Sequence, residues 1–400
     1  MKIIYITHDG LTDHIGQSQI LPYILDTSSE HDFWIISVEK DLNNVKLLRE
    51  TFSHNKNIHW TPIRYPSSSI FGFFLESIKM IYISVKTIIH NKVDIIHCRC
   101  YPGIFIGVVV KILTFFVGPR LLFDIRDFWL DSRIDTRKNK FIYRFLKLFE
   151  KFIYRISDGY VILTENAKKH IQRKYDISEN GKKSITVIPC CADFEHFNPN
   201  KIKDSDKSDL RNKLSLNNDD FILGYLGSLG PDYLINEMLD VFYIIKSLKN
   251  TSVFLMVTNT VEYARKKIQE DPRFTNDDFR IICSDRSMVP SYISLFNLSL
   301  VFIRPAFSKS GCSPTKVAEL LSMNVPVLAN EGVGDLDSLL SMPKNSSTVI
   351  SLPIDEHEIK SFIEFIDRNS EKVFIRNNSK DLTLQNGARL YLSAYNSLYD

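Results

Sequence analysis

The feature that most constrains this chain is an alternation of short β-rich runs with longer helical runs, which occurs twice along its 400 residues. Strands that are separated by helices pair in parallel, because each helix carries the chain back along the sheet. In the first half we expect strands at 2–7, 32–38, 93–97, 120–124, 160–164 and 185–188, with helices at 16–27, 70–90, 103–117, 138–156 and 165–174.

The alternation begins again after residues 199–220, a polar and charged stretch with the composition of a linker. The sequence therefore predicts an α/β protein with two doubly wound, Rossmann-like domains, at 1–198 and 199–380, and a last helix over 381–400 that packs back on the first domain. Ligands of such sheets bind outside the carboxyl ends of the strands, so the cleft between the domains is the expected active site. The second set of expected strands is 221–225, 253–257, 279–283, 298–303, 325–329 and 348–352.

Composition sets broad limits on the kind of protein. With 44% hydrophobic and 24% charged residues, the chain is typical of a globular protein. Its net charge of +3 argues neither for nor against a nucleic-acid partner, and we expect none. Its six cysteines form no zinc-type C-x-x-C pair, so we expect free thiols in a reducing compartment and no metal.

The longest apolar stretch, 103–118, is interrupted by Lys111 and falls short of the ~20 residues of a membrane span. We expect no signal peptide, and a cytoplasmic protein that is soluble or peripheral on the membrane.

The strongest local signal for function lies in residues 302–335, where an expected strand runs into a loop of small residues and then a helix. Ser313 is the expected N-cap, with Pro314 at the first helical position. The amides of Thr315 and Lys316 would then point outward and, with the lysine charge, suit a diphosphate. Glu319, one turn on, is placed to accept the hydroxyls of a ribose. The alternative is an ordinary capped helix with surface charges.

Seven segments along nearly the whole chain carry a signal when they are taken together and in order. They are DGLTDHIGQSQILPYI (9–24), DIIHCRCYPG (94–103), FDIRDFWLDSRID (123–135), DGYVILTENAKKHI (158–171), ITVIPCCADFEHFNP (185–199), LGYLGSLGPDYLINEMLD (223–240) and 302–335. On these segments the chain resembles the retaining glycosyltransferases of family 4, which have the GT-B fold. The resemblance implies transfer of a sugar from a UDP-, GDP- or dTDP-sugar to a glycan or lipid-linked acceptor, with retention of configuration and without metal or cofactor. Cell-surface polysaccharide biosynthesis is the pathway that it suggests.

The resemblance also implies a sugar-donor site. Gly16 matches the first-loop glycine whose backbone approaches the diphosphate, and Glu319 matches the second Glu of an E-x7-E motif. The first Glu would fall at Gly311, which departs from the family pattern and predicts a subgroup with a small residue there. The loop 227–234 has neither the Arg nor the Lys usual in the family, so phosphate charge must come from elsewhere. The expected donor-binding residues are Gly16, Gly227, Ser228, Arg286, Lys309, Ser310, Gly311, Ser313, Thr315, Lys316 and Glu319.

Other candidates lie at strand ends in the first half. We expect His97 and Arg99 to face the cleft, with one of them near the sugar or its leaving phosphate. Arg126 would hold an acidic acceptor or the donor phosphate, unless it pairs with Asp127. These three residues and Lys316 are the predicted catalytic set, and Gln17 and Asp127 are predicted on the acceptor side.

Two further motifs have a functional and a structural interpretation. The basic segment 137–155 (RKNKFIYRFLKLFEKFIYR) would lie on an anionic membrane surface, or be a core-packed helix with a solvated basic face. The pair Asp335 and Asp337 resembles a metal-binding D-x-D, but we interpret it as a helix cap.

Three competing functions follow from the same residues. A nucleotide-sugar epimerase of the same fold would turn over the donor without an acceptor. A non-catalytic sugar-nucleotide-binding subunit would bind the donor without turnover, which Gly311 favours. A nicotinamide-dependent oxidoreductase would need G-x-G-x-x-G after the first strand, and residues 7–16 do not supply it.

Overall fold

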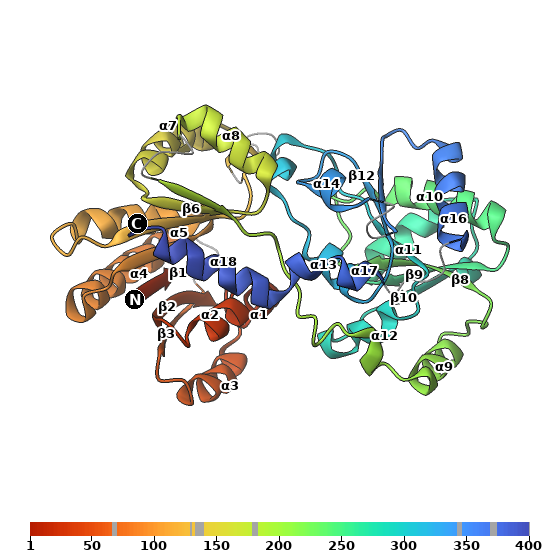
Figure 1. The fold of residues 1–400 in the computed structure, drawn as a ribbon, viewed down its shortest axis with the longest axis horizontal. Helices are drawn as coiled ribbons and strands as arrows, with labels where there is room; N and C mark the ends of the chain where they lie inside the picture. The colour runs from red at the N-terminus through yellow and green to blue at the C-terminus, as the bar shows by residue number, and fades with distance from the viewer. Residues whose placement is uncertain are drawn as a thin grey trace. The chain divides into compact units, whose positions relative to one another are not determined.

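A computed structural model describes residues 1–65, 70–128, 130–132, 140–177, 183–341, 346–368 and 374–399. The chain divides into two compact units, each built on one parallel sheet (Figure 1). The predicted fold class, α/β with two doubly wound domains, is confirmed. Unit 1 comprises Met1–Cys190, Phe307–Cys312 and Leu384–Asp400, and unit 2 comprises Cys191–Ala306 and Ser313–Thr383.

The sheet of unit 1 has the strand order β3-β2-β1-β4-β5-β6-β7, so the order reverses between β1 and β4. Ligands of doubly wound sheets bind at such a reversal, outside the carboxyl ends of the strands. The strands are β1 (Lys2–Ile6), β2 (Asp32–Glu39), β3 (Ile58–Arg64), β4 (Ile95–Arg99), β5 (Arg120–Ile125), β6 (Gly159–Ile162) and β7 (Ser184–Val187).

Helices cover both faces of this sheet. On one face α4 packs against α5 and α5 against α7, while on the other face α18 packs against α2. The helices of unit 1 are α1 (His14–Gln19), α2 (Leu21–Thr27), α3 (Leu42–Ser53), α4 (Ile70–Asn91), α5 (Cys100–Leu113), α7 (Lys140–Ile156), α8 (Glu165–Tyr175) and α18 (Leu384–Asn396), with the 3-10 turn η4 (Phe307–Gly311).

Two parts of unit 1 differ from the sequence prediction. The single helix expected at 16–27 is broken at Ile20 (φ −128°, ψ −62°), because Pro22 has no N–H and its ring would clash with the carbonyl of Ser18 in a continuous helix. The elements α3 and β3 were not predicted. Strand β3 contains Pro62, which the sheet tolerates because β3 lies at its edge.

Unit 2 has the strand order β10-β9-β8-β11-β12-β13, again with a reversal, here between β8 and β11. Its strands are β8 (Phe221–Leu226), β9 (Ser252–Val257), β10 (Phe279–Ile282), β11 (Leu298–Val301), β12 (Val327–Asn330) and β13 (Thr348–Ile350). Its helices are α9 (Asp204–Lys213), α10 (Ile235–Leu248), α11 (Val261–Gln269), α12 (Val289–Ile293), α13 (Thr315–Ser322), α14 (Leu336–Leu339), α16 (Glu356–Arg368) and α17 (Phe374–Asn377), with 3-10 turns η1 (Pro199–Lys201), η2 (Asn276–Asp278), η3 (Arg286–Met288) and η5 (Lys380–Leu382).

The units divide between Cys190 and Cys191, whereas the polar stretch 199–220 placed the boundary at 198/199. The difference has a packing reason. Phe194 and Phe197 are buried in the hydrophobic core of unit 2, so the chain has already joined that unit before the polar stretch begins. The segment 307–312 is a second difference, because it groups with unit 1 although the chain on either side of it belongs to unit 2.

A substitution at Gly16 would test how tightly the first loop packs. A Cβ at Gly16 would lie 2.0 Å from the carbonyl oxygen of Gly10 and 2.6 Å from the Cα of Leu11, and both are backbone atoms. We expect Gly16→Ala to lower the free energy of unfolding by about 3 kcal/mol or more, as overpacking against a backbone does. A Cβ at Gly230 meets nothing within 4 Å, so Gly230→Ala is the control and should stay within about 0.5 kcal/mol of the parent. Equal urea midpoints for the two variants would contradict this packing.

Candidate functional site

The candidate site lies at the carboxyl edge of the unit 2 sheet, where the loops after β8, β9, β10 and β11 come together. Ser228, after β8, donates a hydrogen bond through its hydroxyl to Asn259 Oδ1, after β9 (2.8 Å). The amide of Leu229 donates to the hydroxyl of Thr260 (2.8 Å). These contacts fix the loop after β8, which contains the predicted residues Gly227 and Ser228.

Lys316, the second residue of α13, reaches back over the end of β8. Its ammonium lies 4.6 Å from the ring centroids of both Tyr225 and Tyr233, and 3.4 Å from the Tyr225 hydroxyl. An ammonium over aromatic faces is held electrostatically by the ring quadrupoles. The Tyr225 hydroxyl itself donates to the carbonyl of Ser228 (2.7 Å). The lysine is thus held in place by β8 and by the loop that follows it.

Gly227 is required by this arrangement for two reasons. Its φ of +114° lies in the region that favours glycine, and a Cβ there would lie 2.8 Å from the Lys316 nitrogen. The loop after β8 and the first turn of α13 therefore come into contact at Gly227, which places the lysine charge directly beside the backbone of the loop.

Glu319 and Arg286 form an ion pair one turn further along α13. The Arg286 Nη1 atom lies 3.1 Å from Glu319 Oε1, and the guanidinium packs over the ring of Phe197 (5.3 Å). Glu319 is buried, whereas the side chain of Arg286 is 40% exposed. Burial raises the pKa of Glu319, and Arg286 opposes this rise by favouring the carboxylate. His196, which the sequence reasoning did not single out, contacts the carbonyl of Arg286 (3.1 Å).

The start of α13 differs by one residue from the prediction. Pro314, not Ser313, is the N-cap, because its extended ψ of 116° keeps it outside the helix, and Thr315 is the first helical residue. The amide of Val317 donates to the carbonyl of Pro314 (3.0 Å). The first amides of any α-helix have no intrahelical acceptor, so the turn at Thr315 and Lys316 still presents the positive end of the helix.

The expected donor-site residues Lys309, Ser310 and Gly311 group with unit 1 and not with α13. This corrects the expectation that they belong to the second domain. The carbonyl of Ser310 accepts a hydrogen bond from the hydroxyl of Thr164 (2.8 Å). Gly311 is buried, and a Cβ there would lie 3.2 Å from the ring of Phe128. A glutamate at 311 would therefore need Phe128 to move, which gives a packing reason for the glycine.

Packing within unit 1 also explains why residue 16 is a glycine. The first loop folds over it, and this loop is held by the buried carboxylate of Glu39. Glu39 accepts from the amides of Leu11 (2.7 Å) and Thr12 (3.1 Å), so these amides are occupied by a carboxylate of the same unit. Gln17 donates through its side-chain amide to the carbonyl of Leu11 (2.8 Å).

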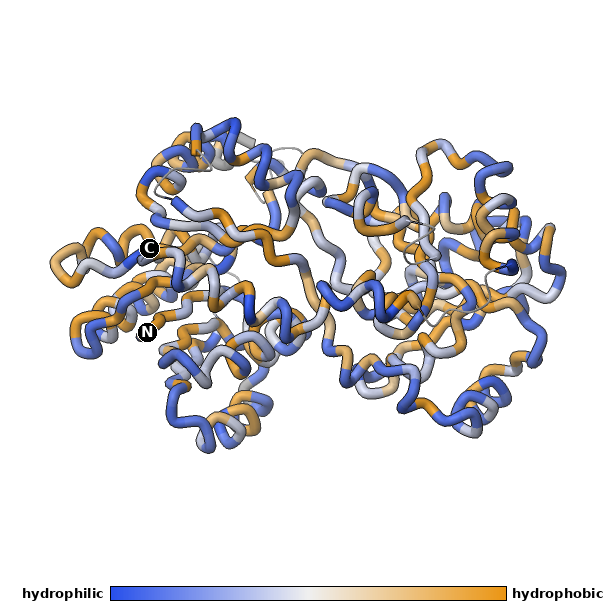
Figure 2. The backbone as a smooth tube through the Cα atoms, in the orientation of Figure 1, coloured by the Kyte–Doolittle hydropathy of each residue, from blue (hydrophilic) through white to orange (hydrophobic). Residues whose placement is uncertain are grey.

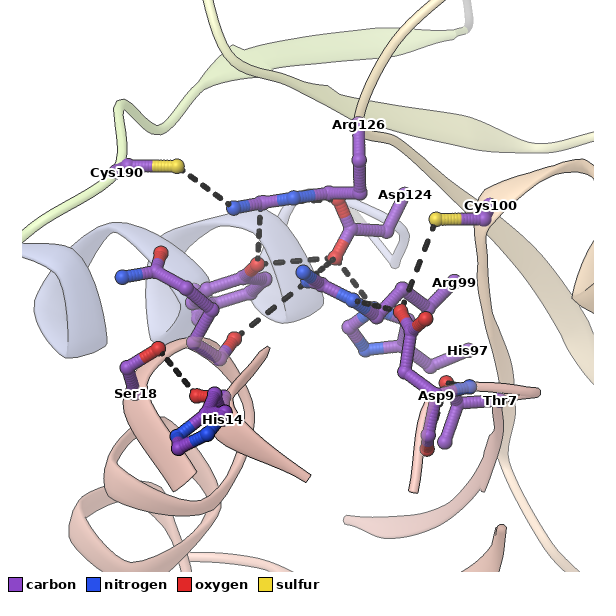
Figure 3. A network of polar contacts seen from close by, with 12 residues as sticks. Thr7, Asp9, His14, Ser18, His97, Arg99, Cys100, Asp124, Arg126 and Cys190 are labelled. Carbon is purple, nitrogen blue, oxygen red and sulfur yellow. Dashed lines mark hydrogen bonds and ion pairs between the residues drawn. The ribbon is translucent and has the colours of Figure 1, made fainter. Parts of the chain in front are cut away.

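The predicted catalytic residues His97, Arg99 and Arg126 come together in unit 1 around Asp124, as Figure 3 shows. Asp124 Oδ2 lies 3.4 Å from His97 Nε2 and 3.6 Å from Arg99 Nη1, and its other oxygen lies 3.3 Å from Arg126 Nη1. Arg99 Nε also donates to Asp9 (3.0 Å). Arg126 therefore pairs with Asp124, and Asp127 is half-buried beside it.

The last helix closes over this cluster. The Tyr395 hydroxyl lies 2.9 Å from His97 Nδ1, and the Tyr391 hydroxyl donates to Asp124 Oδ2 (3.0 Å) and accepts from Arg126 (3.2 Å). His97 and Asp124 are fully buried, with no exposed surface on either side chain. Burial alone would raise the pKa of Asp124, but Arg126, His97 and Arg99 together lower it. The side chains balance one another's charges, which is how a buried ionic cluster is stabilised.

His8 and Glu76 are a pair that the sequence reasoning missed. His8 Nε2 lies 3.5 Å from Glu76 Oε1, and the His8 ring stacks on Phe73 (5.5 Å). Burial lowers the pKa of His8 to about 4 and raises that of Glu76 to about 7. His8 directly follows the expected strand 2–7, so the rule that singled out residues at strand ends would have found it.

The predicted capping role of Asp335 is only partly observed. It is the N-cap residue of α14, but its side chain makes no capping hydrogen bond. Within the described part of the chain, no group of three or more His, Cys, Asp or Glu side chains is placed to bind a metal ion. Over the same residues, no helix is both long and apolar enough to cross a bilayer.

Comparison with solved structures identifies the class of fold. The chain superposes on HepE of Anabaena, solved in complex with UDP-glucose, with a TM-score of 0.70 and 14% identity over 99% of this chain and 100% of that one. Sucrose-phosphate synthase of Thermosynechococcus elongatus gives a TM-score of 0.67 and 15% identity over 100% and 99% of the two chains. The fold is that of the GT-B glycosyltransferases.

One curated relative adds a sequence likeness. The chain is 25% identical over 291 residues to the capsular polysaccharide biosynthesis glycosyltransferase CapM of Staphylococcus aureus, covering 72% of this chain and 70% of CapM. No protein-family model matches the chain. The fold and the named relative together support a glycosyltransferase.

The pair of Glu76 and His8 predicts a pH effect on stability. The native state keeps a proton on Glu76 that the unfolded carboxyl releases between its ordinary pKa of 4.5 and the folded value of about 7. Below pH 4.5 the carboxyl is protonated in both states, so Glu76 does not lower the free energy of unfolding. This free energy then falls as the pH rises through about 7. Glu76→Gln should raise the free energy of unfolding at pH 8 by about 2 to 3 kcal/mol and change it little at pH 4.5. An equal effect in urea unfolding at both pH values would show that Glu76 titrates normally.

Proposed function

We propose that this chain is a retaining glycosyltransferase that moves a sugar from a nucleoside-diphosphate sugar to a hydroxyl of a glycan or lipid-linked acceptor. The observation that carries the proposal is the group of Lys316, Arg286 and Glu319 at the carboxyl edge of β8, β10 and β11, in a chain with the GT-B fold. This edge is where doubly wound sheets bind nucleotides.

The donor diphosphate would bind at the start of α13. There Lys316 lies in the first turn of α13, at the positive end of the helix, and the half-exposed Arg286 guanidinium contacts Glu319 one turn further along. An anion at a helix N-terminus is stabilised by the amide dipoles and by added cations. One carboxylate oxygen of Glu319 pairs with Arg286, so the other oxygen can accept hydrogen bonds from the ribose hydroxyls.

The chemistry that follows is mainly electrostatic. The bond between the anomeric carbon and the diphosphate oxygen breaks, and the acceptor hydroxyl attacks from the same face. Its proton passes to the departing phosphate oxygen. Lys316 and the helix N-terminus lie where negative charge grows on the leaving group, and fixed donors at such a position are usually the largest catalytic contribution. No pair of carboxylates is needed in this scheme, in contrast to glycoside hydrolases.

The names of the compared proteins direct the first experiments. HepE was solved with UDP-glucose, and CapM is a transferase of capsular polysaccharide biosynthesis. We therefore infer a role in cell-surface polysaccharide assembly, with uridine diphosphate sugars as the first donors to test. A panel of UDP-, GDP- and dTDP-sugars in thermal unfolding should show one nucleotide that raises the melting temperature, since binding to the folded state alone stabilises it. Absence of any shift at millimolar nucleotide would reject a donor site.

A second candidate is a non-catalytic sugar-nucleotide-binding subunit. It is favoured by Gly311, because the position of the first Glu of the E-x7-E motif is a glycine here, packed against Phe128. This candidate predicts the same thermal shift without release of nucleoside diphosphate. Measuring nucleoside diphosphate release with an acceptor extract therefore separates the two candidates.

Glu319→Gln tests the ribose contact. The substitution keeps the size of the side chain but removes the charge that accepts hydrogen bonds, so affinity for UDP should fall about tenfold or more in calorimetric titration. Glu356→Gln, on α16 at a side chain that is 62% exposed, is the matched control and should bind UDP like the parent. Unchanged affinity in Glu319→Gln, with a normal melting temperature, would remove Glu319 from the site.

Lys316→Met tests the leaving-group contact. Methionine can occupy the space between the two tyrosine rings without the charge, so kcat should fall by ~10²-fold or more. Lys267→Met is the control, because Lys267 of α11 pairs with the exposed Glu270 at the end of that helix, on the surface. Turnover by Lys316→Met at the rate of the control would mean that the cation does not act on the leaving group.

A further inference from the structure

One feature that the candidate site does not use is an exposed apolar surface on one helical layer of unit 1. It is formed by the outward sides of α4, the end of α5 with the turn that follows, and α7. Since α4 packs on α5 and α5 on α7, these three sides are neighbours. Figure 2 shows hydrophobic residues along α4 and α5. Contiguous exposed surfaces of this kind normally mark a binding partner.

The stripe on α7 is the clearest part of this surface. Phe141, Phe145, Leu148, Phe149 and Phe152 follow the spacing of one helix face, and all five are exposed, with Phe141 at 83% and Leu148 at 74%. The helix instead turns its opposite side, around the buried Ile153 and Tyr154, toward the core. An amphipathic helix ordinarily buries its apolar stripe, so α7 is reversed relative to a normal surface helix.

Helix α4 repeats the arrangement. Phe71, Leu75, Ile78 and Tyr82 are exposed along one face, while Met80 is fully buried on the other. At the end of α5, Phe115 and Phe116 are 77% and 62% exposed. A hollow of about 420 Å³ lined by Ile112, Phe115 and Ile156 connects the end of α5 with the end of α7.

The exposed charges that belong to α4, α5 and α7 themselves all have one sign. Helix α4 has a single acidic residue, Glu76, and α7 has a single one, Glu150, while α5 has none. Both carboxylates are buried, at 6% and 2% exposure. Glu150 accepts a hydrogen bond from the hydroxyl of Tyr101 (2.6 Å) and forms an ion pair with Lys147 (3.0 Å). Its negative charge is therefore compensated within unit 1.

Five cations of α4 and α7 are exposed. Lys79 and Lys86 on α4, and Arg144, Lys151 and Arg155 on α7, are exposed beside the apolar stripes. Apolar side chains flanked only by cations complement an anionic lipid surface, in which the rings enter the acyl boundary and the long basic side chains reach the headgroups. A protein partner would need acidic residues matched to these five positions, whereas an anionic bilayer offers its charge anywhere.

We propose that α4, the turn after α5 and α7 together form a docking surface for an anionic lipid bilayer, on which unit 1 lies without crossing it. The proposal widens the sequence expectation for the segment 137–155, of which 137–139 lie outside the described residues, to three elements. It does not depend on the sugar-donor site, since every residue that it uses belongs to unit 1 and none contacts Lys316 or Glu319.

Vesicle co-sedimentation of the full chain tests the proposal. The protein should pellet with vesicles of phosphatidylglycerol and phosphatidylcholine, pellet less at high salt, and stay in solution with phosphatidylcholine alone. Phe145→Ser with Leu148→Ser should lower the partition coefficient roughly tenfold or more. Lys151→Gln with Arg155→Gln should lower it about fivefold per charge, and only on the anionic vesicles.

The matched control is Leu47→Ser with Phe374→Ser, two side chains of similar exposure (65% and 61%) on α3 and α17, outside this surface. All variants should unfold at the parent temperature, which shows that lost binding is not lost folding. The proposal is overturned if the parent does not bind anionic vesicles, or if Phe145→Ser with Leu148→Ser binds like the control pair. Lipid-free dimers that this variant abolishes would assign the surface to a second copy and equally overturn it.

Discussion

The contact of Lys316 with the rings of Tyr225 and Tyr233 holds the carboxyl edge of unit 2 in its observed form. The ammonium, 4.6 Å from both centroids, joins the first turn of α13 to the end of β8, and it requires a glycine at 227. The same contact explains why the loop after β8 needs no basic residue of its own. A cation supplied from α13 already occupies the position above this loop, so the positive charge expected near a diphosphate comes from the neighbouring element.

Unit 1 uses its charges differently. Asp124 is surrounded by His97, Arg99 and Arg126 and covered by Tyr391 and Tyr395 of the last helix. Removing one partner from such a buried cluster leaves an uncompensated charge, so the group binds the last helix to the sheet of unit 1. Three of the four residues predicted as catalytic, His97, Arg99 and Arg126, thus balance one buried charge inside unit 1. The outward side of α4, α5 and α7 shows the opposite pattern, with carboxylates inside and cations outside.

The sequence predicted the alternating elements, both parallel sheets and the position of α13, because hydrophobic periodicity and helix-start residues are local signals. It also singled out Lys316, Glu319 and Arg286 as candidates, but it did not predict the ion pair between the last two. What it could not predict depends on contacts between distant segments. The packing of Phe307 on Phe128 (5.2 Å), which places 307–312 with unit 1, joins residues far apart in the chain. Likewise, nothing local to His97 shows that Tyr395 covers it.

The most direct test of the account is a crystal structure of the protein with a bound nucleoside diphosphate, uridine diphosphate first. The account predicts phosphate oxygens within hydrogen-bonding distance of the Lys316 ammonium and of the amides that begin α13, with the ribose against Glu319. A nucleotide bound elsewhere, with the Lys316 ammonium still enclosed by the tyrosine rings and remote from phosphate, would contradict it.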